Sequence, residues 1–398
     1  MSKTQVIITI DESNLSQHTK NDYSYRLGVF FKNSKIKSLE ELIKIPSDDL
    51  QYDLVKYTQF LVNRVKNKEI SPNSVPKYFK GIKYVLDVNY RENDVKWKPI
   101  RALFPTKVRF SGYKSWTTEQ ISEMEKYCKN TRNLAFLHFM ASTGGRIGIN
   151  DSPLLLKHLV PMSSTNNESN QDCYAVLFYA ESDESAHEKD ARESEADDIQ
   201  SGDSYWVFLT PEATKYLRRY HDQRKRRGEV FGDDTPIFRT QFQVQYINQN
   251  INQLSRAGAI SLMNRILTNT SLGRIKKGRR YDTQLDHGFR KRFNTIMKLE
   301  NSVNSNIAEK ILGHKNGLDG VYFTPTREQC FTEFVKAIPE LTISPTERQK
   351  VIIENKNKEI VQLESKNEEI ELQKDEIDRL SRAVEYLMKK EESKLIEI

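Results

Sequence analysis

Apolar residues recur at spacings of three and four through the first part of the chain, which is the spacing of an amphipathic helix. "SLEELIKI" and "DDLQYDLVKYTQFLVNRVKNK" show this pattern clearly. "SPNSVPKYFKGIKYVLDVN" begins a further helix near Ser74, with Pro76 in its first turn, where proline is favoured. We therefore predict a small all-helical domain over residues 16–105, preceded by an N-terminal arm at residues 1–15.

The pattern changes after a short, basic, turn-rich stretch at residues 106–115, which we interpret as a linker. Residues 116–344 contain further helical patterns and two runs rich in aromatic and β-branched residues, "CYAVLFYA" and "SYWVFLT". Such runs indicate strands. An acidic insert at residues 180–203 separates them, so we expect a hairpin with a long insert. The predicted fold class is mainly α with a small β-sheet (α+β).

Residues 345–398 form a third kind of segment, composed almost entirely of good helix formers. Leu363, Ile370, Ile377 and Val384 recur every seven residues, although the apolar seam shifts along the segment. An exposed apolar stripe on a helix needs a partner to cover it. We interpret the segment as a coiled-coil-like helix, and a lone solvated helix remains the alternative.

Composition excludes several classes of protein. Hydrophobic residues make up 37% of the chain and charged residues 29%, and no apolar run approaches the length of about 18 residues that a membrane span needs. The N-terminus shows no signal-peptide pattern, so we expect a cytoplasmic protein without membrane contact. Cys128, Cys173 and Cys330 are odd in number and widely spaced, which argues against a disulfide framework and a zinc site.

The formal net charge of +7 is unevenly distributed. The acidic insert holds ten acidic residues against Lys189 and Arg192, and the C-terminal segment is also acidic, so the rest of the chain is strongly basic. Such a surplus predicts a polyanionic partner. Two interpretations of the basic stretches stay open: contact with phosphates, and an ordinary solvent-exposed surface. The candidate DNA-binding residues are Lys77, Lys80, Lys83, Arg274, Lys276, Lys277, Arg279 and Arg280.

Five residues of the second domain could act on a phosphodiester. Arg146 follows two glycines in "STGGRIG", and His287 and Arg290 share one helix face in "DHGFRKR" at positions i and i+3. His314 and Tyr322 lie in "EKILGHKNGLDGVYFTPT", where glycines and a proline interrupt the helical pattern. Taken singly, each has an ordinary structural interpretation: a surface arginine, a chance pair, a core tyrosine, or a turn.

The order of these motifs carries more information than any one of them. "STGGRIG", "TPEA", "DHGFRKRFNTI" and "AEKILGHKNGLDGVYFTPT" together resemble the tyrosine recombinase or phage-type integrase family, and its archaeal branch in particular. "ISPNSVPKYFKGIKYVLDVN" resembles the N-terminal core-binding domain of that family. The resemblance covers residues 16–344 and implies a helical core-binding domain followed by a mixed catalytic domain.

The resemblance also implies a reaction. Tyr322 would attack a DNA phosphorus and form a 3′-phosphotyrosyl bond, while Arg146 and Arg290 clamp the non-bridging oxygens. His314 would add a hydrogen bond, and His287 would accept the tyrosine proton. The phosphotyrosyl bond keeps the energy of the cleaved phosphodiester, so the hydroxyl of a second DNA strand can displace Tyr322 without ATP. No cofactor is therefore expected. The chain shows no phosphate-binding loop or metal-ligand spacing that would suggest one.

One part of the family pattern is missing. The family usually carries a lysine on the β-hairpin that protonates the leaving 5′-oxygen, but neither predicted strand contains one. Lys189, inside the acidic insert, is the remaining candidate.

The predicted function is site-specific DNA recombination, with four protomers on two sites of double-stranded DNA and a mobile element as the setting. Two other functions stay open. A type IB topoisomerase-like enzyme would use the same groups to relax DNA, and a catalytically silent DNA-binding protein would keep only the fold.

Overall fold

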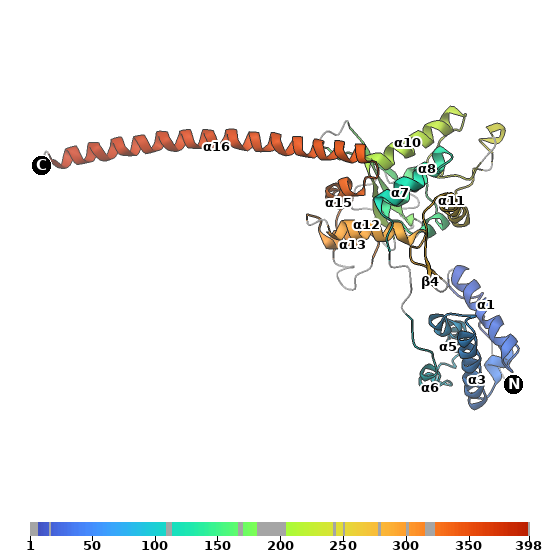
Figure 1. The fold of residues 1–398 in the computed structure, drawn as a ribbon. Coiled ribbons are helices and arrows are strands. Elements are labelled where there is room, and N and C mark those ends of the chain that lie inside the picture. Colours follow the sequence, from blue (N-terminus) through green and yellow to red (C-terminus); the bar gives the residue numbers. More distant parts are fainter. Residues whose placement is uncertain are drawn as a thin grey trace. The chain divides into compact units, whose positions relative to one another are not determined.

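The structure is a computed structural model (Figure 1). It describes residues 7–15, 17–108, 114–165, 170–180, 204–241, 244–249, 251–277, 280–299, 302–314 and 323–396. The chain divides into two compact units, Met1–Phe110 and Ser111–Ile398. Among the described residues, every helix is too short or too polar to cross a membrane.

The regular elements of the first unit, over its described residues, are all helices. Its elements are α1 (Gln17–Asn33), α2 (Leu39–Lys44), α3 (Ser47–Lys66), η1 (Pro72–Ser74), α4 (Val75–Tyr78), α5 (Lys80–Val88) and α6 (Trp97–Ala102). Phe30, Tyr57 and Ile82 lie in its buried core. The single helix expected after Ser74 is in fact two, because the backbone turns at Phe79, whose side chain is buried in this core.

The second unit begins with α7 (Thr118–Glu125) and α8 (Thr131–Thr143), followed by the short turns η2 (Ile147–Asp151) and η3 (Leu156–His158). Thr117 caps α7 in a capping box with Gln120. The chain then enters the sheet β1 (Leu159–Met162), β2 (Cys173–Phe178) and β3 (Tyr205–Leu209). The remaining elements are α10 (Pro211–Arg226), η5 (Val244–Tyr246), α11 (Arg256–Asn269), β4 (Lys276–Lys277), β5 (Arg280–Tyr281), α12 (His287–Leu299), α13 (Ser305–Ile311), α15 (Arg327–Leu341) and α16 (Pro345–Ile396).

The three-stranded sheet is buried on both faces. It is antiparallel throughout, in the order β1-β2-β3, with Val176 opposite Val207 in the central pair. Alternate residues point to opposite sides of a strand. Accordingly, Val207 faces a core shared with α7, α8, α10 and α11, while Phe208 faces a second core shared with α12, α13 and α15. The second unit is therefore a small sheet between two helical layers, and the predicted class, mainly α with a small β-sheet, is confirmed.

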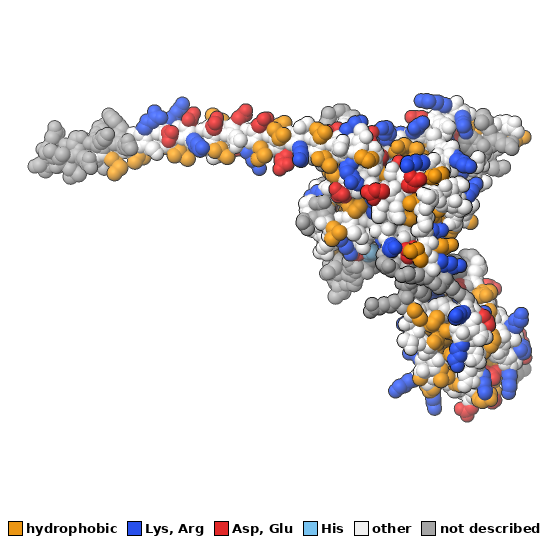
Figure 2. All heavy atoms as spheres, viewed as in Figure 1, with side chains coloured by type: hydrophobic (Ala, Val, Ile, Leu, Met, Phe, Trp, Pro, Cys, Tyr) orange, Lys and Arg blue, Asp and Glu red, His pale blue; other side chains and the backbone are white. Residues whose placement is uncertain are grey.

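Helix α16 extends away from the body of the second unit. Its first turns contact α15, and Val351 packs against the second core. Beyond that point apolar side chains recur along its exposed length, as Figure 2 shows. Ile370, Ile377 and Val384, for example, are each about half exposed. The helix thus carries an apolar stripe that the described part of the chain does not cover.

Candidate functional site

Three chain segments, called the arms of the site below, contribute to it. The first is the turn after α8. Helix α8 ends at Gly144, which has a φ of 58°, a left-handed conformation that favours glycine. A Cβ at Gly144 would lie 2.6 Å from the Cβ of Phe293 on α12, so glycine also permits the close approach of the two helices. Arg146 follows at the start of η2, and its side chain is half-buried.

The second arm is α12, whose Arg290 is buried and reaches across to both neighbouring segments. Its Nη1 donates a hydrogen bond to the carbonyl oxygen of Gly144 at 3.2 Å, and its Nη2 donates to the carbonyl oxygen of Leu312. Nη2 also lies 2.9 Å from Nε2 of His314. His287 is the first residue of α12, one turn before Arg290, and is exposed. Arg290 therefore links the turn after α8 with the end of α13.

The third arm is the end of α13. Gly313 has a φ of 63°, and a Cβ there would lie 2.3 Å from the ring of Tyr205 on β3. This turn brings His314 back beside Glu309, whose carboxylate contacts Nδ1 of the imidazole. A guanidinium can only donate hydrogen bonds. His314 Nε2 is thus the acceptor from Arg290, and Nδ1 carries the proton toward Glu309.

The two arginines of this cluster carry positive charge that the described residues do not pair with a carboxylate. Burial, and next the positive charge of Arg146, lower the pKa of Arg290. Among the described residues, neither arginine forms an ion pair with a carboxylate, whereas the buried Arg224 is paired with Glu229. Two neighbouring guanidinium groups without a counter-ion form a place where an anion would be stabilised.

Glu309 is a site residue that sequence reasoning missed. It precedes His314 by five positions, a spacing that would not bring the two together on a continuous helix. Lys298 contacts the other carboxylate oxygen. Burial raises the pKa of Glu309, but the hydrogen bonds from Lys298 and His314 outweigh it and hold that pKa below its ordinary value. Glu309 is consequently an anion that fixes the orientation of the His314 ring.

Several predicted residues lie outside the described part of the chain: Tyr322, Lys189 and Arg279. The chain is described again from Phe323, which packs against the second core. The structure brings together Arg146, Arg290 and His314, and it puts His287 one helical turn from Arg290.

The predicted DNA-binding residues fall on two separate segments. Lys77 lies in α4, and Lys80 and Lys83 lie in α5; all three are exposed. Arg274 lies over the ring of Tyr281 at 4.2 Å, and Lys276 is exposed on β4. Lys277 and Arg280 belong to the paired strands β4 and β5, but their side chains lie outside the description.

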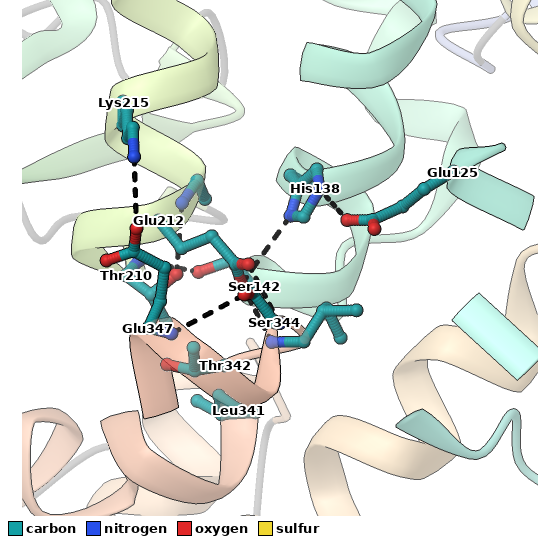
Figure 3. Close-up of polar contacts among 12 residues, drawn as sticks. Glu125, His138, Ser142, Thr210, Glu212, Lys215, Leu341, Thr342, Ser344 and Glu347 are labelled. Carbon is teal, nitrogen blue, oxygen red and sulfur yellow. Dashed lines mark hydrogen bonds and ion pairs between the residues drawn. The ribbon is translucent and has the colours of Figure 1, made fainter. Parts of the chain in front are cut away.

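A separate buried polar cluster lies between α8, α10 and the start of α16 (Figure 3). His138 Nε2 is 2.5 Å from Glu125 Oε1, and its Nδ1 is 3.8 Å from Glu212 Oε2. Their potential metal-ligand atoms lie within 4.8 Å of one another. However, both carboxylate oxygens of Glu212 accept backbone N–H groups, from Ile343 and Ser344. Glu212 is thus already used to attach the segment between α15 and α16.

Comparison with known proteins gives similarity only among solved structures. No family model matches the chain, and no curated protein matches it. The chain is similar to a XerH site-specific recombinase bound to its difH substrate (15% identity, 78% of this chain and 78% of that one, TM-score 0.45). It is also similar to the Tn1549 transposon integrase in complex with circular-intermediate DNA (14% identity, 81% of this chain and 95% of that one, TM-score 0.44). A third similar structure is a lambda integrase dimer bound to a core site (12% identity, 80% of this chain and 92% of that one, TM-score 0.45).

Proposed function

We propose that this protein is a site-specific DNA recombinase of the tyrosine recombinase or phage-type integrase kind, from the archaeal branch. The observation that carries the proposal is the contact between Arg290 and His314 beside Arg146, with no described carboxylate paired to either arginine. A DNA phosphate supplies the missing negative charge. Two guanidinium forks suit it because they stay charged and can each hold two oxygens.

The mechanism assigns one task to each side chain. Arg146 and Arg290 bind the non-bridging oxygens, whose charge grows as Tyr322 attacks the phosphorus. His314 adds a hydrogen bond once its Nε2 carries a proton, and Glu309 keeps the ring in place through Nδ1. His287, exposed at the start of α12, accepts the proton of the Tyr322 hydroxyl. The result is a 3′-phosphotyrosyl bond and a free 5′-hydroxyl, and no metal or cofactor takes part.

Double-stranded DNA is the proposed partner, and a mobile element is the proposed setting. The exposed Lys77, Lys80 and Lys83, together with the β4–β5 hairpin, would contact phosphates without reading bases. Affinity should therefore fall steeply with salt. Four protomers would assemble on two sites, in the cytoplasm, where the DNA substrate is found.

Helix α16 would hold protomers together as a coiled coil. Substituting Ile370 and Ile377 by asparagine removes two members of the apolar stripe and leaves the helical residues around them unchanged. The doubly substituted protein should have a lower mass in sedimentation equilibrium than the wild type. A matched change at the exposed charged residues Glu368 and Glu371 to glutamine should leave the mass unchanged. An equal mass for all three proteins would argue against the coiled coil.

Covalent capture tests the proposed function without knowledge of the target site. Purified protein is mixed with nicked duplexes of random sequence, so that cleavage releases a short fragment and traps the enzyme. Complexes that survive boiling in detergent are isolated, and their DNA is sequenced. We expect one recurring sequence, recovered from the wild type and absent with Tyr322→Phe.

A tyrosine elsewhere supplies the control. Tyr246 is exposed, and Tyr246→Phe should give as much adduct as the wild type. If no sequence is recovered with the wild type, the proposed function is wrong. If the wild type forms adducts on all sequences and relaxes any plasmid without joint products, the topoisomerase-like activity is the better description.

A further inference from the structure

Tyr179 has an unusual backbone conformation for its position. It follows the last residue of β2 and has a φ of 57°. Two other non-glycine residues of the described chain have a positive φ, Lys68 and Tyr90, and both follow helix ends, where this conformation is common. Both are exposed, whereas Tyr179 is half-buried. Strained backbone that persists away from helix ends is found preferentially at functional sites.

This conformation brings Tyr179 against the turn that carries Arg146. Phe178 fills the space beside Gly145, because a Cβ there would lie 2.8 Å from its ring. The Tyr179 hydroxyl lies 3.9 Å from the position that a Cβ of Gly148 would take. The two consecutive aromatic residues therefore contact the turn on both sides of Arg146.

Tyr179 also adjoins the other two arms of the cluster. Its ring centroid is 6.0 Å from that of Tyr205, and the Tyr205 ring packs on Gly313, directly before His314. Burial raises the pKa of Tyr179, and the charges of Arg146 and Arg290 are the largest effects that oppose this rise. The phenol is consequently protonated at neutral pH, and two guanidinium groups are close enough to stabilise the phenolate that remains after a proton is lost.

We propose that Tyr179 is a further catalytic residue, which donates its hydroxyl proton to the leaving 5′-oxygen of the cleaved strand. This inference rests on the function proposed above. As the Tyr322 oxygen bonds to phosphorus, the bond from phosphorus to the 5′-oxygen breaks, and that oxygen takes the bonding electrons and the proton of Tyr179. In rejoining, the Tyr179 phenolate removes the proton from the attacking 5′-hydroxyl. The bond from phosphorus to Tyr322 breaks, and the Tyr322 oxygen takes the bonding electrons and the proton that His287 accepted during cleavage.

The acid strength of the phenol suits this task. Strands β2 and β3 contain no lysine. A tyrosine hydroxyl has an ordinary pKa of about 10, close to the value of about 10.4 for lysine. Burial raises the pKa of Tyr179, so the hydroxyl keeps its proton until the leaving alkoxide, a much stronger base, takes it. Tyr179 stands at the end of β2, where the hairpin meets the arginines.

The test compares two leaving atoms on the DNA sequence recovered by covalent capture. One substrate has the natural phosphodiester; the other has sulfur in place of the bridging 5′-oxygen. A thiolate leaves without needing a proton. We expect Tyr179→Phe to cleave the natural substrate about 100-fold more slowly than the wild type, in the range typical for loss of a general acid. On the sulfur substrate it should cleave within a few-fold of the wild-type rate.

Tyr205→Phe is the matched control, because Tyr205 is the neighbouring tyrosine and loses the same atom. It should change the rates on the two substrates by the same factor. Thermal melting of both variants checks that they are folded. An unchanged rate of Tyr179→Phe on the natural substrate, or an equal loss on both substrates, overturns the inference. Failure of the wild type on both substrates would instead remove the proposed function, and the inference with it.

Discussion

Arg290 donates a hydrogen bond from Nη2 to Nε2 of His314 at 2.9 Å, although 24 positions separate the two residues in the chain. The same guanidinium binds the carbonyl oxygen of Gly144, so a single buried side chain connects the three segments of the site. This arrangement means that changes at Arg290 should affect both stability and reaction rate.

Arg290→Lys tests the need for the guanidinium fork. Lysine keeps the charge but cannot reach the two carbonyl oxygens and a phosphate together. We expect the rate of DNA cleavage to fall by about 100-fold, the effect of losing one donor to the transition state. The measurement is the single-turnover rate on the captured sequence. Arg292→Lys is the control, because Arg292 contacts Thr118 and Glu340 instead; it should lower stability and leave the rate per folded molecule unchanged.

Glu309→Gln tests the orientation of His314. Glutamine has the same shape as glutamate but no negative charge, so it holds the proton on Nδ1 less firmly while Nε2 carries a proton of its own. We expect cleavage to slow by about 10–100-fold, the size of effect seen when a residue that orients a metal-binding histidine is changed. Lys298→Ala removes the other partner of Glu309 and should slow cleavage by no more than a few-fold. Equal and small effects of both changes would show that Glu309 does not position the imidazole.

Gly313→Ala tests the turn before His314. The new Cβ would lie 2.3 Å from the Tyr205 ring, and the alanine would have to adopt a backbone φ of 63°. We expect the free energy of unfolding to fall by about 1–3 kcal/mol and cleavage to be nearly lost. Chemical denaturation and the cleavage assay measure the two effects. Gly28→Ala, in the middle of α1 with open space around it, should raise stability by about 0.5–1 kcal/mol.

The buried ion pairs of Glu229 should make the free energy of unfolding depend on pH. Its buried carboxylate is paired with Arg224 and Arg239. Burial raises the pKa of Glu229, but the hydrogen bonds and charges of the two arginines outweigh it, so the folded-state pKa lies below the ordinary value of 4.5. A lowered folded-state pKa gives stability that is present above pH 4.5 and is lost as the pH falls through the folded-state pKa.

Glu229→Gln should therefore lower the free energy of unfolding by about 3–5 kcal/mol at pH 7, because the buried Arg224 and Arg239 lose the carboxylate that they share. The difference from the wild type should shrink below pH 4.5. Denaturant unfolding at pH 7, 5 and 4 measures it. Glu347→Gln, at a partly exposed ion pair with Lys215, should differ from the wild type by less than about 1 kcal/mol. A pH-independent difference at Glu229 would contradict the assigned pKa.

Local patterns predicted much of the fold. The hairpin of β2 and β3 followed from its aromatic and β-branched residues, and the class of the fold followed with it. Strand β1 was missed because it is short and contains Pro161, which is tolerated here because β1 is at the sheet edge. The break at Phe79 was missed because the helical spacing of apolar residues continues across it, through Phe79 and Ile82.

The site was less accessible to sequence reasoning because its contacts are long-range. The order of motifs selected Arg146, Arg290 and His314, but nothing in the sequence shows that Arg290 binds the carbonyl oxygen of Gly144. Glu309 escaped notice because its contact with His314 requires the left-handed turn at Gly313. Tyr179 escaped because its backbone conformation is not a property of its sequence neighbourhood.

The most direct test of the account is to identify the amino acid that carries the DNA. The captured complex is digested with nuclease and protease, and the peptide that retains a nucleotide is sequenced by mass spectrometry. We expect a 3′-phosphonucleotide on Tyr322, the residue directly before Phe323. A nucleotide on any other residue, or a 5′-phosphate linkage, would contradict it.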